Sequence, residues 1–279
     1  MQCRFFKEKC MKYFVVSDIH AHYDEFIQAL KDAGWFEYKG KKKLIICGDV
    51  MDRGPTAKQL QEFILELMDQ DLVILVKGNH ETLMMEMLDD ICRDPKDIIS
   101  DWSHHWSNGT LNSALQLVDM TYEEYKKAPM AFASKLAASP FITKIIPACV
   151  NYYETDNYIF VHGWIPHQVE RTYRMKFYHY MPNWRHASAL EWENARWPNG
   201  MELACREGII EDGKTIVCGH WHCSWGHTYI HRESPEWGPK ANFTPFRDKG
   251  IIAIDACTAY TKKVNCIVLE EPNEQLDNC

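Results

Sequence analysis

Residues 44–54 read LIICGDVMDRG, and this stretch indicates the fold more clearly than any other part of the chain. Leu44–Cys47 is an apolar run of strand length that ends at a glycine. Such a run is typical of a buried strand. Asp49, Asp52 and Arg53 follow it closely. In open α/β sheets, ligands bind beyond the carboxyl ends of the strands, so we interpret these polar residues as part of a site.

Apolar runs and amphipathic segments alternate through the first half of the chain. Strands are predicted at Tyr13–Val16 and Leu72–Val76 as well, and each of the three strands is followed by apolar residues at helical spacing. This order predicts parallel strands joined by right-handed crossovers. Later strands are predicted at Tyr158–Val161, Thr215–Cys218, Ile251–Ile254 and Val264–Leu269.

The pattern predicts one domain over residues 1–279, because no repeat, low-complexity tract or flexible linker interrupts it. A polar, helical insertion is predicted at about 95–140. A second insertion, rich in tryptophan, tyrosine and histidine, is predicted at about 164–208, where no strand is expected. Residues 223–249 receive no assignment and are expected to form either a β-rich extension or a loop near the mouth of the site.

Composition excludes several classes of protein. With 46% hydrophobic and 25% charged residues, the chain is typical of a soluble globular protein. Its 31 Lys+Arg against 39 Asp+Glu give a net charge of −8, which argues against a broad basic surface for nucleic acid. No apolar run reaches the roughly 18 residues of a membrane span. The 11 cysteines are odd in number and scattered, and no secretory signal is evident, so we expect reduced thiols and a cytoplasmic location.

Polar residues follow five of the predicted strands. Taken singly, each group also fits a helix cap, a local ion pair or a buried histidine. Their joint occurrence at strand ends predicts a shared site instead. Carboxylate, imidazole and amide ligands suit Mn, Fe or Zn and require no thiolate. The groups are Asp18 with His20; Asp49, Asp52 and Arg53; Asn79 with His80; His162; and His220 with His222.

This set of motifs resembles the calcineurin-like metallophosphoesterases, and within them the phosphoprotein phosphatase and dinucleoside tetraphosphatase branch. The resemblance extends from residue 13 to about residue 260 and implies an α/β fold, a β-sandwich of mixed sheets flanked by helices in four layers. It also implies two divalent metal ions, Mn²⁺ first, with Fe or Zn as alternatives. The matching segments are Asp18-x-His20, Gly48-Asp49-x-x-Asp52-Arg53-Gly54, Gly78-Asn79-His80-Glu81, His162-Gly163 and Gly219-His220.

The resemblance implies a ligand set for each metal ion. Asp18 and His20 are expected to hold one ion, and Asp49 to bridge the two. The second ion is expected to be held by Asn79, His162 and His220. The wider superfamily often carries Gly-His-x-His at this last motif, which makes His222 a candidate ligand of the first ion; the alternative is a histidine outside the ligand set.

The resemblance also implies catalytic roles. His80 is expected to be the general acid, Asp52 to orient it and raise its pKa, and Arg53 to contact the phosphoryl oxygens. Lys77 stands where the phosphoprotein phosphatases carry an arginine. It keeps the positive charge at this substrate-binding position but lacks the planar guanidinium that donates two parallel hydrogen bonds. Arg196 is a candidate second phosphate-binding arginine.

Three functions compete at this stage. The leading expectation is a phosphatase that hydrolyses phosphomonoesters, above all phosphoserine or phosphothreonine in proteins, by direct attack of a metal-bridging hydroxide. The first alternative is hydrolysis of dinucleoside polyphosphates, because Gly219-His220-Trp221 resembles the tetraphosphatases. In that case Trp184, Trp192 and Trp197 are candidates for stacking adenines. The second alternative is a metal-binding interaction protein without turnover. Expected partners are a phosphorylated protein or a small phosphoester, with no nucleic acid or membrane, and the oligomeric state is left open.

Overall fold

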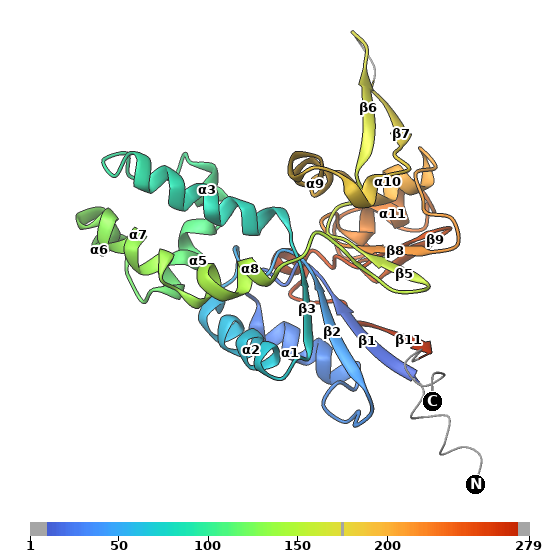
Figure 1. Cartoon of the computed structure of the whole chain (residues 1–279), viewed down its shortest axis with the longest axis horizontal. Coiled ribbons are helices and arrows are strands. Elements are labelled where there is room, and N and C mark those ends of the chain that lie inside the picture. The colour runs from blue at the N-terminus through green and yellow to red at the C-terminus, as the bar shows by residue number, and fades with distance from the viewer. Residues whose placement is uncertain (1–9, 174–175, 273–279) are drawn as a thin grey trace.

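The computed structural model describes residues 10–173 and 176–272, and its first sheet holds the predicted N-terminal strands (Figure 1). The strand order is β11-β1-β2-β3. β1, β2 and β3 are parallel, as the crossovers require, and β11 runs antiparallel to β1 at the edge. The strands are β1 (Cys10–Val16), β2 (Lys42–Cys47), β3 (Val73–Val76) and β11 (Ile267–Pro272).

The second sheet is formed by the later part of the chain. Its order is β4-β5-β8-β10-β9, with three parallel central strands and an antiparallel strand at each edge. Both sheets are therefore mixed. The strands are β4 (Tyr153–Glu154), β5 (Tyr158–Phe160), β8 (Thr215–Cys218), β9 (Phe246–Asp248) and β10 (Ile251–Ala253).

Side chains that alternate between the two faces of each strand allow the two sheets to pack as a sandwich. Val15 and Ile45 of the first sheet are fully buried against Val217 of the second, in a cluster that fills the space between the sheets. Their neighbours Phe14 and Leu44 point to the opposite face and pack against helices. Successive side chains of a strand alternate between its two faces, so both faces of the first sheet are covered.

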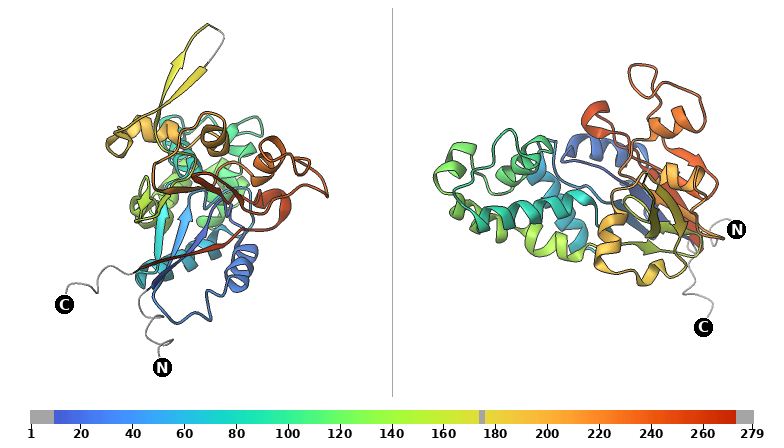
Figure 2. Two further views of the ribbon diagram at one scale, coloured as in Figure 1. Left: turned by 90° about the vertical axis from the view of Figure 1, so that its right-hand side faces the viewer. Right: turned by 90° about the horizontal axis from the view of Figure 1, so that it is seen from above.

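Helices cover the outer faces of both sheets. The first sheet packs against α1 (Tyr23–Asp32), α2 (Ala57–Asp69) and α3 (Asn79–Arg93). The second sheet packs against α10 (Gly200–Cys205) and α11 (Cys223–Tyr229). The result is a four-layer arrangement of helices, sheet, sheet and helices, which confirms the predicted fold class (Figures 1 and 2).

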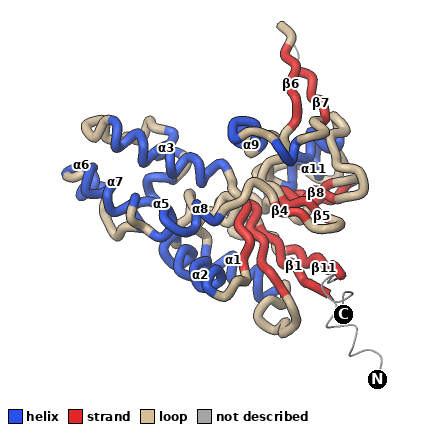
Figure 3. The backbone as a smooth tube through the Cα atoms, in the orientation of Figure 1, coloured by secondary structure: helices blue, strands red, loops and turns tan. Residues whose placement is uncertain are grey.

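The segment from about 95 to 140 is helical. Figure 3 shows α3, α5, α6 and α7 gathered on one side of the sheets. Thr121 begins α6 with a capping box in which Glu124 bonds back to it. The segment holds α4 (His104–Ser107), α5 (Thr110–Leu117), α6 (Tyr122–Lys127) and α7 (Pro129–Ala137), and a π-helix (Phe141–Ile145) and α8 (Ile146–Ala148) lead out of it.

The aromatic segment at 164–208 differs from expectation, because it contains two strands. β6 (His167–Arg171) and β7 (Lys176–Tyr180) form an antiparallel hairpin that projects from the body (Figures 1 and 2). Among the described residues they pair only with each other, and most of their side chains are exposed, so no buried face requires an apolar run in them. A 3₁₀ turn (Trp184–His186), α9 (Ala189–Ala195) and α10 follow.

Residues 223–249, left open above, form α11 and then a long loop before β9. A last short helix, α12 (Thr258–Thr261), precedes β11. The nine cysteines within the described ranges are all free. Over the same ranges, no helix combines the length and the apolar character that crossing a membrane requires. The division into one domain with two insertions stays a prediction.

Candidate binuclear metal site

The carboxyl ends of five parallel strands bring the motif residues together. β1, β2 and β3 of one sheet end at the same edge as β5 and β8 of the other. The backbone there is unusual: seven of the twelve described non-glycine residues with positive φ lie in these strand-end loops. Left-handed backbone outside glycine is uncommon and collects at functional sites. The seven are Asp18, His20, Ala21, Asp49, Asp52, Arg53 and His220.

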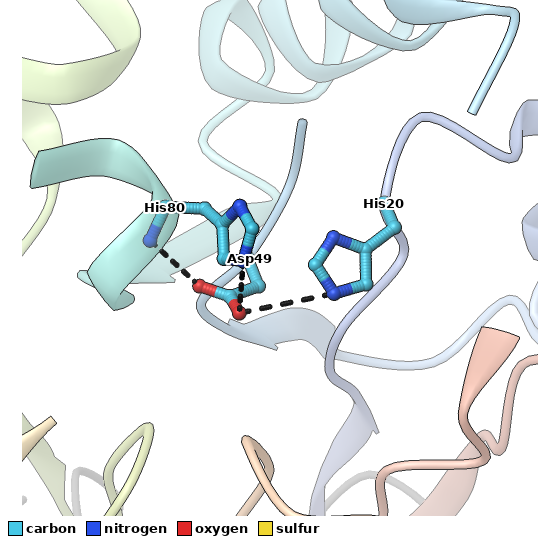
Figure 4. Close-up of side chains that lie close together, drawn as sticks. All are labelled: His20, Asp49 and His80. Atoms are coloured by element: carbon cyan, nitrogen blue, oxygen red, sulfur yellow. Dashed lines mark hydrogen bonds and ion pairs between the residues drawn. The ribbon is translucent and has the colours of Figure 1, made fainter. Parts of the chain in front are cut away.

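Asp49 lies at the centre of the site and faces two groups of histidines, the first of which, His20 and His80, is drawn in Figure 4. Its Oδ2 lies 3.8 Å from Nε2 of both His20 and His80. Its Oδ1 lies 3.2 Å from Nε2 of His162, and His220 completes that second group. Within each group the ligand atoms lie within 4.8 Å of one another. One carboxylate shared by two groups is the arrangement that a bridging ligand requires.

The orientation of two of these histidines also fits metal binding. Nδ1 of His20 lies 3.0 Å from the carbonyl oxygen of Met51, and Nδ1 of His162 lies 2.8 Å from that of Cys47. A carbonyl only accepts, so each Nδ1 carries the proton and each Nε2 turns toward Asp49. Metal-bound histidines are commonly held in this way. Asn79 joins them, with its Oδ1 2.8 Å from Nε2 of His162.

Several buried carboxylates surround the same point. Burial and the neighbouring Asp255 raise the pKa of Asp18 well above its usual range. Burial likewise raises the pKa of Asp255 to about 6. Burial opposes the charge of Asp49 too, but His162 and His80 hold its pKa well below the usual range. A bound cation would offset the cost of these buried charges. The donor set of carboxylate, imidazole and amide therefore fits divalent metal ions.

The Gly219-His220 motif positions Asp18. Its Oδ2 accepts a hydrogen bond of 3.0 Å from the backbone N–H of His220. A Cβ on Gly219 would lie 2.1 Å from this oxygen, which explains why a glycine precedes His220. Asp18 is not among the residues grouped with His20 around Asp49, where His80 stands instead. Its role as a ligand of the first ion stays a prediction.

His80 lies between the carboxylate of Asp52 and the guanidinium of Arg53. Its Nδ1 lies 2.6 Å from Oδ2 of Asp52, and its Nε2 lies 3.1 Å from Nη2 of Arg53. Burial opposes protonation of His80, but the charges of Asp49 and Asp52 outweigh it and raise its pKa. The contact between Asp52 and His80 is the one expected of an orienting carboxylate, and the role of His80 as general acid stays a prediction.

Residues outside the predicted set hold this dyad in place. The hydroxyl of Thr110 donates to Oδ2 of Asp52 at 2.7 Å, and Oγ of Ser113 accepts from the Asp52 backbone at 2.8 Å. Both belong to α5, so the helical segment supports the loop after β2 that carries Asp52. Glu81 has a similar role, because its carboxylate accepts from the backbones of Gly78, Asp49 and Val50. It fastens the loop after β2 to the start of α3.

A model of the calcineurin-like phosphoesterases matches residues 11–224, which is most of the chain. The chain belongs to this family. Family membership implies a binuclear divalent metal centre, and the two groups around Asp49 are its candidate ligands.

Curated relatives of this phosphoesterase include two bis(5'-nucleosyl)-tetraphosphatases. The asymmetrical enzyme PrpE of Bacillus velezensis is 33% identical over 76 residues, 25% of this chain and 30% of its own. The symmetrical enzyme of Enterobacter sp. is 31% identical over 125 residues, 44% of this chain and 43% of its own. The chain thus matches less than half the length of these relatives. Among solved structures, a cold-active protein tyrosine phosphatase matches with a TM-score of 0.50 and 18% sequence identity. The match covers 92% of this chain and 73% of that one, and it shows a shared fold.

Three further residues predicted for the phosphoesterase site have other surroundings. His222 lies outside both groups around Asp49, and its Nε2 lies 3.2 Å from Glu236. Arg196 is buried, with hydrogen bonds to Glu193 and, at 2.8 Å, to Asn151. Lys77 is half-buried directly after β3. Their predicted roles in metal or substrate binding stay predictions.

Asp255 lies beside the site and is not among the residues predicted from the sequence. It follows β10, which lies beside β8 in the second sheet, so it reaches the same edge as His220. Its Oδ1 accepts a 2.6 Å hydrogen bond from the backbone of Cys257, and its charge acts on Asp18. The signal that identifies it is its position at a strand end, which it shares with the recognised motifs.

Proposed function

We propose that this phosphoesterase hydrolyses dinucleoside polyphosphates, with diadenosine tetraphosphate as the type substrate. The observation that carries the proposal is a pair of aromatic-lined clefts, one beside each group of histidines. The tetraphosphatase relatives support it as well. A phosphoprotein phosphatase, the leading expectation from sequence, becomes the second candidate.

The first cleft opens next to Arg53. Its volume is about 800 Å³, within the range of small-molecule sites. Trp106 lines it with 43% of its surface exposed, and Tyr122 packs edge-on against that ring at 5.2 Å. Arg53 also contacts His80, so this cleft adjoins the His20 and His80 side of the site.

The second cleft lies between the β6–β7 hairpin and α9–α10, with a volume of about 630 Å³. Trp197 and Trp221 line it and are 46% and 37% exposed. The ring of Trp197 meets that of His220 edge-on at 6.0 Å. Its wall carries two cationic residues, Arg171 and Lys176, and two acidic ones, Glu191 and Glu202. This cleft therefore adjoins the His162 and His220 side of the site.

Two of the tryptophans expected to stack adenine are not available for it. Trp184 and Trp192 are buried and pack around Tyr152. Trp184 also donates a 3.0 Å hydrogen bond to Glu211. Their role is core packing, and the exposed rings of Trp106, Trp197 and Trp221 replace them in the proposal.

A substrate with a base at each end and a polyphosphate between them matches this layout. Base stacking on an aromatic side chain contributes about 1–3 kcal/mol per base. The polyphosphate would cross the metal centre, where Arg53 can donate two parallel hydrogen bonds to phosphoryl oxygens. A phosphoserine side chain offers one phosphate and no aromatic base, so it uses at most part of this surface.

Arg53, His80 and Asp52 have different roles in the proposed reaction. When bound, two divalent ions polarise a phosphoryl oxygen and lower the pKa of a nucleophilic water. A guanidinium only donates, so Nε2 of His80 accepts from Arg53 in this structure. A phosphoryl group that engages Arg53 frees this Nε2 to carry a proton to the leaving oxygen. Asp52 holds the ring in the required orientation through Nδ1.

We further propose Mn²⁺ as the working metal and the cytoplasm as the location. Nitrogen and oxygen ligands without thiolate support Mn²⁺, with Fe or Zn as alternatives. Free cysteines throughout the described ranges support a reducing compartment.

A substrate panel on metal-reconstituted protein tests the proposed function. We expect nucleotide products from diadenosine tetraphosphate, resolved by anion-exchange chromatography, and little phosphate from phosphoserine peptides. Phosphate release from the peptides with diadenosine tetraphosphate left intact would instead make the protein a phosphoprotein phosphatase. If the metal-loaded protein turns over neither of these nor an aryl phosphate, it is a metal-binding interaction protein.

A further inference from the structure

A second group of ligand-type side chains lies at the end of α11, outside the Asp49 site. It consists of His227, His231 and Glu233, whose ligand atoms lie within 4.8 Å of one another. His227 is buried, His231 is half-buried and Glu233 is exposed. No step of the proposed reaction uses any of them.

The local fold brings the three residues together. His227 lies in the last turn of α11, and His231 follows the helix by two residues, where its backbone N–H still bonds to the carbonyl oxygen of Gly226 at 3.1 Å. Arg232 then adopts positive φ, and the backbone N–H of Glu233 returns to the carbonyl oxygen of His227 at 2.8 Å. The turn directs the carboxylate of Glu233 back toward the two rings.

The hydrogen bonds fix which ring nitrogens face this carboxylate. Nε2 of His227 lies 3.1 Å from the carbonyl oxygen of Thr244, which only accepts, so this nitrogen carries the proton. Nε2 of His231 lies 3.0 Å from Oδ2 of Asp248. The two Nδ1 atoms face Glu233 instead, at 3.0 Å from Oε2 for His227 and 3.7 Å from Oε1 for His231.

A protonated ring would donate from Nδ1 to Glu233, whereas a neutral ring would not. When a ring is neutral with its proton on Nε2, its Nδ1 presents a lone pair to a carboxylate oxygen, and a cation between them removes the conflict. Metal-bound histidines typically donate their other N–H to a backbone carbonyl or a carboxylate. Here the carbonyl oxygen of Thr244 and the carboxylate of Asp248 are those acceptors.

We propose that Nδ1 of His227, Nδ1 of His231 and the Glu233 carboxylate bind a divalent metal ion, with Zn²⁺ preferred. Zn²⁺ binds imidazole nitrogen and carboxylate oxygen at about 2.0–2.2 Å, so tetrahedral ligand atoms lie roughly 3.3 Å apart. The distances of 3.0 and 3.7 Å lie on either side of that value. Glu233 is exposed, which gives the ion a path from solvent and leaves a position for water.

The proposed ion has a structural role. It joins the end of α11 to the chain that leads into β9, where Asp248 lies. α11 begins directly after His222, and His220 stands two residues earlier in the same loop. Fixing the helix therefore steadies the loop that carries a candidate ligand of the Asp49 site, at a distance from the reacting groups.

Metal stoichiometry of the full chain, measured by plasma mass spectrometry after equilibration with Zn²⁺ and removal of free metal, tests the proposal. We expect three equivalents in the wild type and two in His231→Gln and in Glu233→Gln, which change only half-buried or exposed side chains. His179→Gln, an exposed histidine of the hairpin, is the matched control and should retain three. Asp49→Asn should retain the ion at α11.

A second readout does not depend on the Asp49 site. In Asp49→Asn loaded with Co²⁺, we expect visible absorption bands of a tetrahedral ion, and their loss when Glu233→Gln is added. Unchanged stoichiometry in both His231→Gln and Glu233→Gln, or Co²⁺ bands that survive the added substitution, would overturn the proposal. The three residues would then form only a histidine–carboxylate hydrogen-bond network. Neither result bears on the substrate of the phosphoesterase site.

Discussion

Oδ2 of Asp52 lies 2.6 Å from Nδ1 of His80, and both side chains are buried. The contact fixes the ring of His80 so that its other nitrogen faces Arg53 at 3.1 Å and Asp49 at 3.8 Å. His80 therefore stands where it can serve either as a proton donor or as a ligand beside His20. The two roles predict different results for the same substitution.

We expect His80→Asn to lower turnover by roughly 10²–10⁴-fold with nearly unchanged metal content, because asparagine cannot deliver a proton. Turnover of an aryl phosphate and metal analysis of the same preparation measure the two quantities. Loss of one metal ion in this variant would assign His80 to the ligand set and contradict its role as the acid.

Asp49→Asn should weaken metal binding on both sides of the site. The two carboxylate oxygens of Asp49 face different histidine groups, so removing the charge affects both ions together. Glu123→Gln is a suitable comparison, because Glu123 is exposed, pairs with Lys126 and lies outside both groups. Metal content measured at limiting Mn²⁺ distinguishes the variants, and full occupancy of both positions in Asp49→Asn would refute bridging.

Trp197→Ala should raise the KM for diadenosine tetraphosphate by about 5–100-fold, the loss expected for one stacked base. It should leave the KM for a small aryl phosphate nearly unchanged, since that substrate does not reach the second cleft. Trp102→Ala provides the control, because Trp102 is 93% exposed and lines neither cleft. Equal changes for both substrates would show that Trp197 acts on the metal site and not on a base.

The stability of the second sheet should depend on Glu154 at neutral pH. Arg185 donates two hydrogen bonds to its carboxylate, at 2.8 and 2.6 Å, and lowers the pKa of Glu154 to about 2. The pKa is depressed in the folded state, so this stabilisation is complete above the unfolded value of about 4.3 and is lost as the pH falls toward 2.

Glu154→Gln should therefore reduce the free energy of unfolding by about 1–2 kcal/mol at pH 7, and the deficit should shrink in acid. Urea unfolding of both proteins at neutral and acidic pH measures it. Glu123→Gln, which removes an exposed partner of Lys126, controls for the loss of one carboxylate. If the difference in free energy of unfolding between the two proteins grows as the pH falls, the ion pair of Glu154 does not explain it.

Local patterns in the sequence predicted the buried strands and the strand-end residues, whereas the sandwich was implied by the resemblance to the family. Apolar runs mark the strands, and Asp49 or His162 must stand directly after a strand to reach the shared edge. Thr110 and Ser113 were not predictable, since they meet Asp52 from about sixty residues away in the chain. No motif marks such a contact.

The aromatic segment illustrates a second limit. Composition does not distinguish Trp184, which is buried in the core, from Trp197, which lines a cleft; only the packing of Tyr152 and the neighbouring helices separates them. The β6–β7 hairpin was missed for a related reason. Most of its side chains are exposed, and of its described strand residues only Tyr178 packs against the core of the second sheet, so no regular alternation of apolar and polar residues marks these strands.

The most direct test of the proposed function is a competition between two substrates on one preparation of Mn²⁺-loaded protein. Diadenosine tetraphosphate and a phosphoserine peptide are supplied together, and nucleotide products and free phosphate are followed in the same reaction. We expect diadenosine tetraphosphate to be consumed with the larger kcat/KM. Preferential dephosphorylation of the peptide would contradict the proposed function.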